Sequence, residues 1–250
     1  MLEIEFKLRA PEEELLKHFP EATPASLIHH LESAGIAAAS ALGFSVLGRR
    51  RVLNNDTYYD TANNELATYD VSVRVREAGG EKELTIKLPV KSEPGPFVRQ
   101  ELSTSLSRRP AFEISGATLN TLFSSLPLTS VRFDRQSIGD LFGRVIDEPL
   151  EPKLLVDNNR VVVDLEIGSH NFLAMYFDLY TFATPQDSRN SPPFVELELE
   201  YILDGVKSSY DRIRNLSLRL QADLGLKPSE RSKYQEGLEW MMTHNEATPA

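Results

Sequence analysis

Apolar and polar residues alternate with a period of two in most segments of this chain. The first residues, Glu3-Ile4-Glu5-Phe6-Lys7, already show the pattern, since Ile4 and Phe6 stand between the charged positions. Successive side chains of a β-strand point to opposite faces, so the charged residues would share one face and the apolar residues the other. The same alternation and the turn residues around it predict strands over residues 2–9, 42–53, 55–60, 71–77, 82–89, 97–103, 153–166, 171–182 and 193–202.

Glycine and proline mark the boundaries between these segments. Gly79-Gly80 separates two strand-like segments and predicts a β-hairpin. Helical patterns occupy residues 11–18, 23–35, 116–126, 135–145, 205–224 and 229–243. The second of these begins at Thr23-Pro24 and is expected to end at Gly35.

The composition narrows the class of protein. With 250 residues, 41% of them hydrophobic, and no evident linker, the chain is interpreted as one domain over residues 1–250. The net charge of -10, from 37 acidic and 27 basic residues, argues against a general nucleic-acid binder. The chain has no cysteine, which excludes disulfides and thiolate chemistry. No signal peptide and no membrane-spanning apolar run is visible, so we predict a soluble cytoplasmic protein without a membrane partner.

The charged faces of the predicted strands carry both signs. A β-sandwich needs an apolar inner face, whereas a closed barrel can hold polar side chains inside and bury its apolar outer face under helices. We therefore predict an α+β fold with a closed antiparallel barrel of about eight strands and helices packed on its outside. Burying so many charges contributes little stability by itself. A phosphate-bearing ligand with a hard divalent cation would account for both signs.

Two other interpretations of these charges stay open. Glu3, Glu5 and Lys7 could form the solvated face of an edge strand. The arginines and lysines could instead make cross-strand ion pairs with the glutamates, as structural contacts without a ligand.

Seven short motifs follow one another in order from residue 3 to about residue 240. They are Glu3-x-Glu5-x-Lys7, Asn55-Asp56-Thr57-Tyr58-Tyr59-Asp60-Thr61, Val73-Arg74-Val75-Arg76, Leu84-Thr85-Ile86-Lys87, Arg99-Gln100-Glu101, Glu196-Leu197-Glu198-Leu199-Glu200 and Ser232-Lys233-Tyr234. In this ordered set the chain resembles the CYTH superfamily, the triphosphate tunnel metalloenzymes, which includes thiamine triphosphatases, inorganic triphosphatases and class IV adenylate cyclases. Residues 104–152 do not map onto the family pattern.

The resemblance implies a tunnel barrel with these site residues. Magnesium or manganese would be held by Glu3, Glu5, Glu101, Asp178, Glu196, Glu198 and Glu200. Among the last three, Glu198 is the first choice as a ligand and Glu196 the second, and one of them is expected only to orient a lysine. The triphosphate would be bound by Arg74, Arg76, Lys87, Arg99, Arg160 and Lys233, and catalysis would fall to Lys7, Lys87 and Arg160.

The activity implied is hydrolysis of a small-molecule triphosphate, either inorganic tripolyphosphate or an organic triphosphate. One alternative is an adenylate cyclase that makes cyclic AMP and pyrophosphate from ATP. Another is a protein that binds polyphosphate or a nucleotide without catalysis. We favour the hydrolase, because the matched motifs belong to phosphate and metal binding and none of them indicates a binding pocket for the adenine base. A monomer or a homodimer is expected.

Overall fold

The computed structural model describes residues 2–10, 12–90, 97–106, 114–125, 135–166, 172–187, 190–202 and 207–245. The strands within these ranges are β1 (Leu2–Arg9), β2 (Ser45–Asp60), β3 (Ser72–Ala78), β4 (Glu81–Pro89), β5 (Phe97–Ser105), β6 (Glu151–Glu166), β7 (Phe172–Ala183), β8 (Phe194–Ile202) and β9 (Lys227–Pro228). The helices are α1 (Glu12–His18), α2 (Pro24–Ala41), α3 (Glu65–Thr68), α4 (Gly116–Ser124), α5 (Arg135–Arg144), α6 (Lys207–Leu224) and α7 (Lys233–Asn245).

The sheet closes on itself. Its strand order is β5-β4-β3-β2-β6-β7-β8-β1-β9, and β5 also pairs with β1. Every pairing in the barrel is antiparallel, and β1 is the closing strand, with Lys7 opposite Glu198 on β8 and Glu3 opposite Arg99 on β5. The predicted closed antiparallel barrel of eight strands is therefore confirmed, with the two-residue β9 added at the edge of β1.

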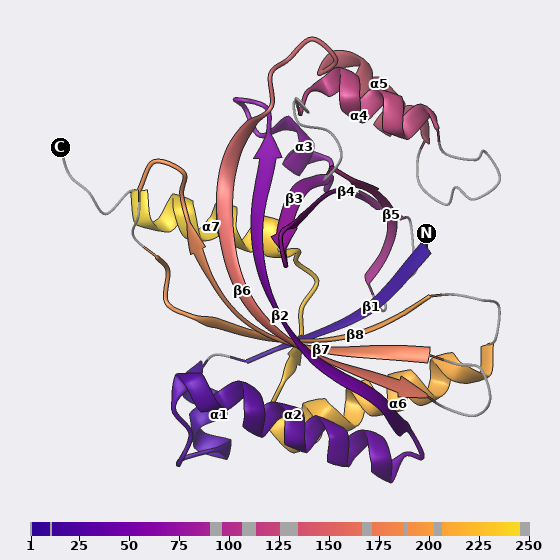
Figure 1. Cartoon of the computed structure of the whole chain (residues 1–250), viewed down its shortest axis with the longest axis vertical. Coiled ribbons are helices and arrows are strands. Elements are labelled where there is room, and N and C mark those ends of the chain that lie inside the picture. Colours follow the sequence, from indigo (N-terminus) through magenta and orange to yellow (C-terminus); the bar gives the residue numbers. More distant parts are fainter. Residues whose placement is uncertain are drawn as a thin grey trace.

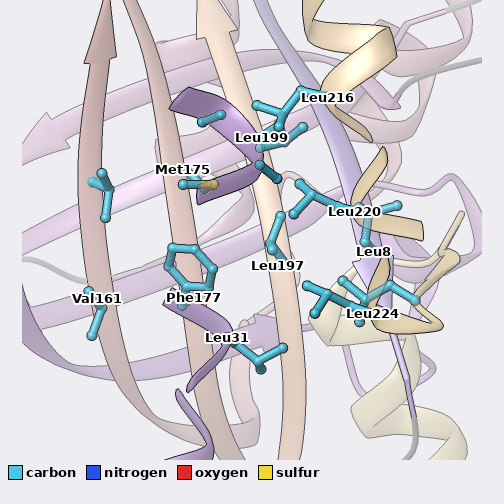
Figure 2. Close-up of a cluster of buried hydrophobic side chains, with 14 of the residues drawn as sticks. Leu8, Leu31, Val161, Met175, Phe177, Leu197, Leu199, Leu216, Leu220 and Leu224 are labelled. Carbon is cyan, nitrogen blue, oxygen red and sulfur yellow. The ribbon is translucent and has the colours of Figure 1, made fainter. Parts of the chain in front are cut away.

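The apolar faces of the strands lie outside the barrel under helices. In Figure 1, α1, α2 and α6 lie along one side of the sheet, and α4 and α5 lie together at the opposite side of the molecule. Leu8 of β1, Phe177 of β7 and Leu197 of β8 pack there with Leu31 of α2 and Leu220 of α6 (Figure 2). The strict alternation of β1 is thus explained, because its even positions are buried against helices while its odd positions face inward.

A second outer cluster contains the two helices of the segment that the family pattern left unmapped. Leu119 and Phe123 of α4 pack with Leu141 and Phe142 of α5 over buried residues of β3 and β4, among them Ile86. The rings of Phe123 and Phe142 meet edge to face at 5.1 Å between centroids. The two weakly patterned helices predicted over 116–126 and 135–145 are confirmed as the outer cover of this barrel wall.

Two predicted boundaries are wrong. The segments 42–53 and 55–60 form one continuous strand, β2, because β6 is equally long and pairs with nearly all of it. The helix expected to end at Gly35 continues to Ala41. A Cβ at Gly35 would lie 2.7 Å from the ring of Phe177, so this glycine allows close packing of α2 on β7 and does not terminate the helix.

Among the described residues, no helix has both the length and the apolar character that crossing a bilayer requires.

Candidate functional site

The inward-facing residues surround a cavity of about 200 Å³ inside the barrel. Its lining is dominated by ionisable side chains from all parts of the chain. The cations are Lys7, Arg74, Arg76, Lys87, Arg160 and Lys233, and the carboxylates are Glu83, Glu101, Glu198 and Glu200. The structure therefore brings together five of the six predicted substrate-binding cations and all three predicted catalytic residues.

Arg74 and Arg76 of β3 are held by a carboxylate that was not predicted as a site residue. Arg76 donates from Nε and Nη2 to the two oxygens of Asp56, both at 2.7 Å, and Arg74 Nη1 lies 3.6 Å from Asp56 Oδ2. Burial alone would raise the pKa of Asp56, but the two arginines lower it below its ordinary value. Asp56 stands opposite Arg76 in the β2–β3 register, so the alternation of β2 could have identified it.

On the adjoining strands β4, β5 and β1, Glu5 and Glu101 share the ammonium of Lys87. Lys87 Nζ donates to Glu5 Oε1 at 2.9 Å and lies 3.3 Å from Glu101 Oε2, while Lys7 Nζ lies 3.0 Å from Glu5 Oε2. Burial would raise the pKa of Glu5, but Lys7 and Lys87 hold that pKa well below its usual range. The pKa of Glu101 is likewise lowered by Lys87 against the effect of burial. Both groups are therefore ionised at neutral pH.

Asp178, Glu196 and Glu198 form a denser cluster on β7 and β8. Arg160 donates to both oxygens of Asp178, at 2.7 and 2.6 Å, and to Glu198 Oε2 at 2.6 Å. Lys233, the first residue of α7, places Nζ 2.9 Å from Asp178 Oδ2 and 3.0 Å from Glu198 Oε1, and it also binds Glu196. Burial by itself would shift each pKa toward the neutral form of the group. The ion pairs outweigh this effect, so the pKa of Asp178 and of Glu198 is lowered and the pKa of Lys233 is raised.

Two residues of this cluster were missed by the sequence reasoning. Arg9 continues the inward face of β1 and binds Glu196 from the side opposite Lys233. Tyr176 lies under the guanidinium of Arg160, with 4.2 Å from Arg160 Cζ to the ring centroid, and also lines the cavity. Both occupy alternating positions on strands that carry predicted site residues, and this alternation is the signal that could have found them.

The first turn of α7 is anchored inside one end of the barrel. Tyr234 stacks on Tyr58 of β2 with 5.2 Å between ring centroids, and its hydroxyl donates to Asp60 Oδ2 at 3.0 Å. Asp60 also accepts backbone N–H groups of Thr61, Leu66 and Ala67, at 2.8 to 3.0 Å. This anchor fixes the start of α7 and therefore the position of Lys233.

Two predicted site residues have other positions, and the side chain of a third is not described. Arg99 is not among the described residues that line the cavity, because it donates to the backbone carbonyl and Oδ1 of Asp70, at 2.7 and 2.9 Å. Glu196 is fully buried between Lys233 and Arg9 and is not among the described residues that line the cavity. Glu3 lies on β1, but its side chain is outside the described part of the structure.

The carboxylates present fit a hard divalent cation by donor type. Asp178, Glu196 and Glu198 each offer an oxygen within 4.8 Å of the others, although the ammonium of Lys233 lies among them. Glu5 Oε2 is buried and lies 3.0 Å from the ammonium of Lys7, with no further hydrogen bond in the described structure. Ionised carboxylate oxygens are the ligands that magnesium and manganese prefer. A buried acidic group that could hold such a metal is thus present in the barrel.

The fold and the site define a class, a closed antiparallel tunnel barrel with an interior of paired cations and carboxylates. The family model of the CYTH domain matches residues 1–144, and the chain belongs to this family. No curated protein sequence matches the chain.

Solved structures resemble the chain at low sequence identity, and HpAC1 shares its fold. HpAC1 from Hippeastrum, described as a putative adenylyl cyclase with a dominant triphosphatase activity, has 15% identity and a TM-score of 0.51, with 95% of each chain covered. A putative adenylate cyclase from Bacillus halodurans has 15% identity and a TM-score of 0.48, covering 94% of this chain and 96% of that one. The Pct1 RNA triphosphatase of S. pombe has 14% identity and a TM-score of 0.35, covering 90% and 82%.

Proposed function

We propose that this protein hydrolyses a triphosphate in a metal-dependent reaction and releases orthophosphate. The single observation that carries the proposal is the composition of the cavity, where six lysines and arginines line one space of about 200 Å³ together with four glutamates. A site for an anion alone would need the cations and not the carboxylates. A site for a triphosphate with a divalent cation needs both.

The cations would supply binding and charge neutralisation. Phosphoryl transfer requires little covalent work from a protein and depends on positioning and on stabilising the charge of the transferred group. Arg74, Arg76 and Arg160 approach the cavity from β3 and β6, and Lys7 and Lys87 approach it from β1 and β4. Phosphate oxygens can therefore be contacted from several walls at once, which fixes the chain of phosphates in one orientation.

The carboxylates would hold the metal. Glu5, Glu101, Glu198 and Glu200 are the candidates, since three of them line the cavity and Glu5 is bound to two lysines that line it. A bound magnesium or manganese ion would neutralise phosphate charge and activate water. Glu196 and Asp178 would instead keep Lys233 and Arg160 in place.

We further propose that residues 1–250 act as one domain on a small-molecule triphosphate. The family match ends at residue 144, but the barrel closes only through β6, β7 and β8, which follow it. Lys233 and Tyr234 of α7 complete the site from a still later segment. The cytoplasmic location and the choice between monomer and homodimer stay predictions from the sequence.

The cyclase alternative would need a surface for adenine. Two aromatic residues line the described cavity, Tyr58 and Tyr176, and each already has a stacking partner, the ring of Tyr234 and the guanidinium of Arg160. Neither ring therefore offers a free face for stacking on the side of its stacking partner. We accordingly expect a compact triphosphate without a base to be the best substrate.

One assay separates the possibilities. The protein is incubated with tripolyphosphate, ATP and thiamine triphosphate, each with magnesium or manganese, and orthophosphate, pyrophosphate and cyclic AMP are separated. We expect orthophosphate from tripolyphosphate, and no turnover in EDTA. Cyclic AMP from ATP, with tripolyphosphate acting only as an inhibitor, would establish the cyclase. Binding of all three without any product would establish a non-catalytic binding protein.

A further inference from the structure

Two buried asparagines face each other inside the barrel and are not explained by the site described above. Asn54 of β2 stands opposite Asn158 of β6 in the strand register, and they are 2% and 3% exposed. Three of their side-chain atoms, Nδ2 of each residue and Oδ1 of Asn158, have no hydrogen-bond partner among the described residues. Buried amides are nearly always paired, so this pair requires an explanation.

The strand register places both amides on the inner face. Tyr58 and Arg160, which line the cavity, lie four and two residues further along β2 and β6, and alternate residues of a strand share a face. Asp56 and Asp178, both within the charged interior, are the nearest carboxylates on the same face by register. The two amides therefore face the inside of the barrel by register, behind Tyr58 and Arg160, and are not themselves among the residues that line the described cavity.

The nearest carboxylates on the neighbouring strands are already in ion pairs. Asp56 is bound by two N–H groups of Arg76, and Asp178 is bound by Arg160 and Lys233. In the described structure neither carboxylate accepts a hydrogen bond from the amides. A bound molecule with acceptor oxygens can supply the partner that the amide N–H groups lack.

We propose that Asn54 and Asn158 form a neutral hydrogen-bonding subsite for a phosphoryl oxygen of the triphosphate, a proposal that rests on the proposed function. The nearby arginines and lysines attract the anion by charge, whereas the amides donate hydrogen bonds in fixed directions and add no charge. A phosphoryl oxygen accepts from both Nδ2 groups. The remaining atom, Asn158 Oδ1, takes a proton donor, which a protonated phosphate oxygen supplies.

The test measures unfolding and binding separately in Asn54→Leu, Asn158→Leu and Asn158→Asp. Binding of tripolyphosphate is measured by titration calorimetry in EDTA, so that no turnover is involved, and the unfolding midpoint is measured without ligand. We expect each leucine variant to have a higher midpoint than the wild type, because an unpaired buried amide is removed. We also expect each to bind tripolyphosphate at least about tenfold more weakly, since a hydrogen bond to a charged group is lost. Asn158→Asp, of nearly the same shape, should bind still more weakly because it repels the anion.

The chain provides matched controls in Asn55 and Asn159, the next residues on the same strands, which point to the opposite face. Their leucine variants should bind tripolyphosphate as the wild type does. If the Asn54 and Asn158 variants also bind like the wild type, the subsite does not exist. A raised midpoint in that case would mean that the amides bind only water, and a lowered midpoint that they are structural. No binding by the wild type in EDTA would overturn the subsite, because the amides are proposed to act without a metal. The proposed function is decided separately by orthophosphate release with magnesium or manganese, so the two failures are distinguishable.

Discussion

The two carboxylate groups of the tunnel differ in how completely they are neutralised. Glu5 and Glu101 form the β1–β5 group, whose cations within the described structure are the flexible ammonium groups of Lys7 and Lys87. Lys87 and Glu101 keep side-chain exposures of 21% and 25%. Lys87 and Glu101 are therefore open to exchange with ligands from the cavity, whereas the side chain of Glu5 is only 2% exposed.

Asp178, Glu196 and Glu198 form the β7–β8 group. They are bound by two arginines and two lysines, and the side chains of all three carboxylates are at most 6% exposed. Removing one partner from such a set leaves an uncompensated buried charge. Similar inward-facing carboxylates are therefore expected to differ in role. The β1–β5 group is the better candidate for coordinating a metal, whereas most of the β7–β8 group holds Arg160 and Lys233 in place.

Replacing Lys233 should have the largest effect. Lys233→Met leaves three buried carboxylates with fewer cations and should lower the free energy of unfolding by about 3–5 kcal/mol. Lys87→Met should cost clearly less, because Lys87 is partly exposed and Glu5 keeps Lys7. Urea unfolding of both variants measures the difference. Equal losses would contradict the contrast between the two groups.

Turnover should respond most to the β1–β5 group. We expect Glu5→Gln to lower orthophosphate release by at least about 100-fold, or about 2.7 kcal/mol of activation free energy, while the fold is retained. Glu196→Gln should lower it less, because Glu196 lies behind Lys233 and away from the cavity. The matched control is Glu77→Gln, an exposed residue of β3. Full activity of the unmodified protein in EDTA would remove the metal from the proposal altogether.

The ion pair of Arg76 with Asp56 tests whether attraction to Asp56 outweighs the repulsion between neighbouring arginines when no ligand is bound. Arg76→Ala should weaken tripolyphosphate binding by about 1.5–3 kcal/mol. It should also destabilise the protein without ligand, since Asp56 is buried and loses two hydrogen bonds. Calorimetric binding and thermal unfolding provide the two measurements. A stabilised variant would mean that charge crowding outweighs the pair with Asp56.

The anchor of α7 should give the smallest effect. Tyr234→Phe removes the hydroxyl that donates to Asp60 and should lower the free energy of unfolding by about 1 kcal/mol. Because Lys233 is the adjacent residue, the Michaelis constant should rise by no more than a few-fold. Tyr69→Phe, at the surface beside Arg144, is the control and should change neither quantity. A large loss of turnover in Tyr234→Phe would give the hydroxyl a direct role in the site.

The barrel could be predicted from the sequence because the alternation of polar and apolar residues within each strand decides which face of the whole sheet is polar. Charged residues at every second position of β1, β3 and β8 required an inner polar face, and the structure places them there. The pattern within one segment could not show which charged side chains form ion pairs with one another. Arg99 follows the same alternation as Glu101, yet it binds Asp70, a loop residue with a φ of 56° whose position depends on the fold around α3.

The errors at helix and strand boundaries have a similar cause. Gly35 carries a helix-ending signal in the sequence, but the contact of α2 with Phe177 decides its role. Asp56 sits in a recognised motif without a predicted role, because its partners lie on the next strand, twenty residues away for Arg76. Partners that depend on tertiary contacts cannot be identified from spacing within one segment.

The position of β1 as the closing strand has a consequence for how the protein is made. The first strand of the chain pairs with β5 and β8, so its glutamates reach their places only after nearly the whole chain has been synthesised. Contacts between such distant segments slow folding and leave strand edges exposed in the meantime. Assembly of the charged interior is therefore expected to be a late folding event. A nascent chain that ends before β8 would contain the whole CYTH match, residues 1–144, but no closed barrel.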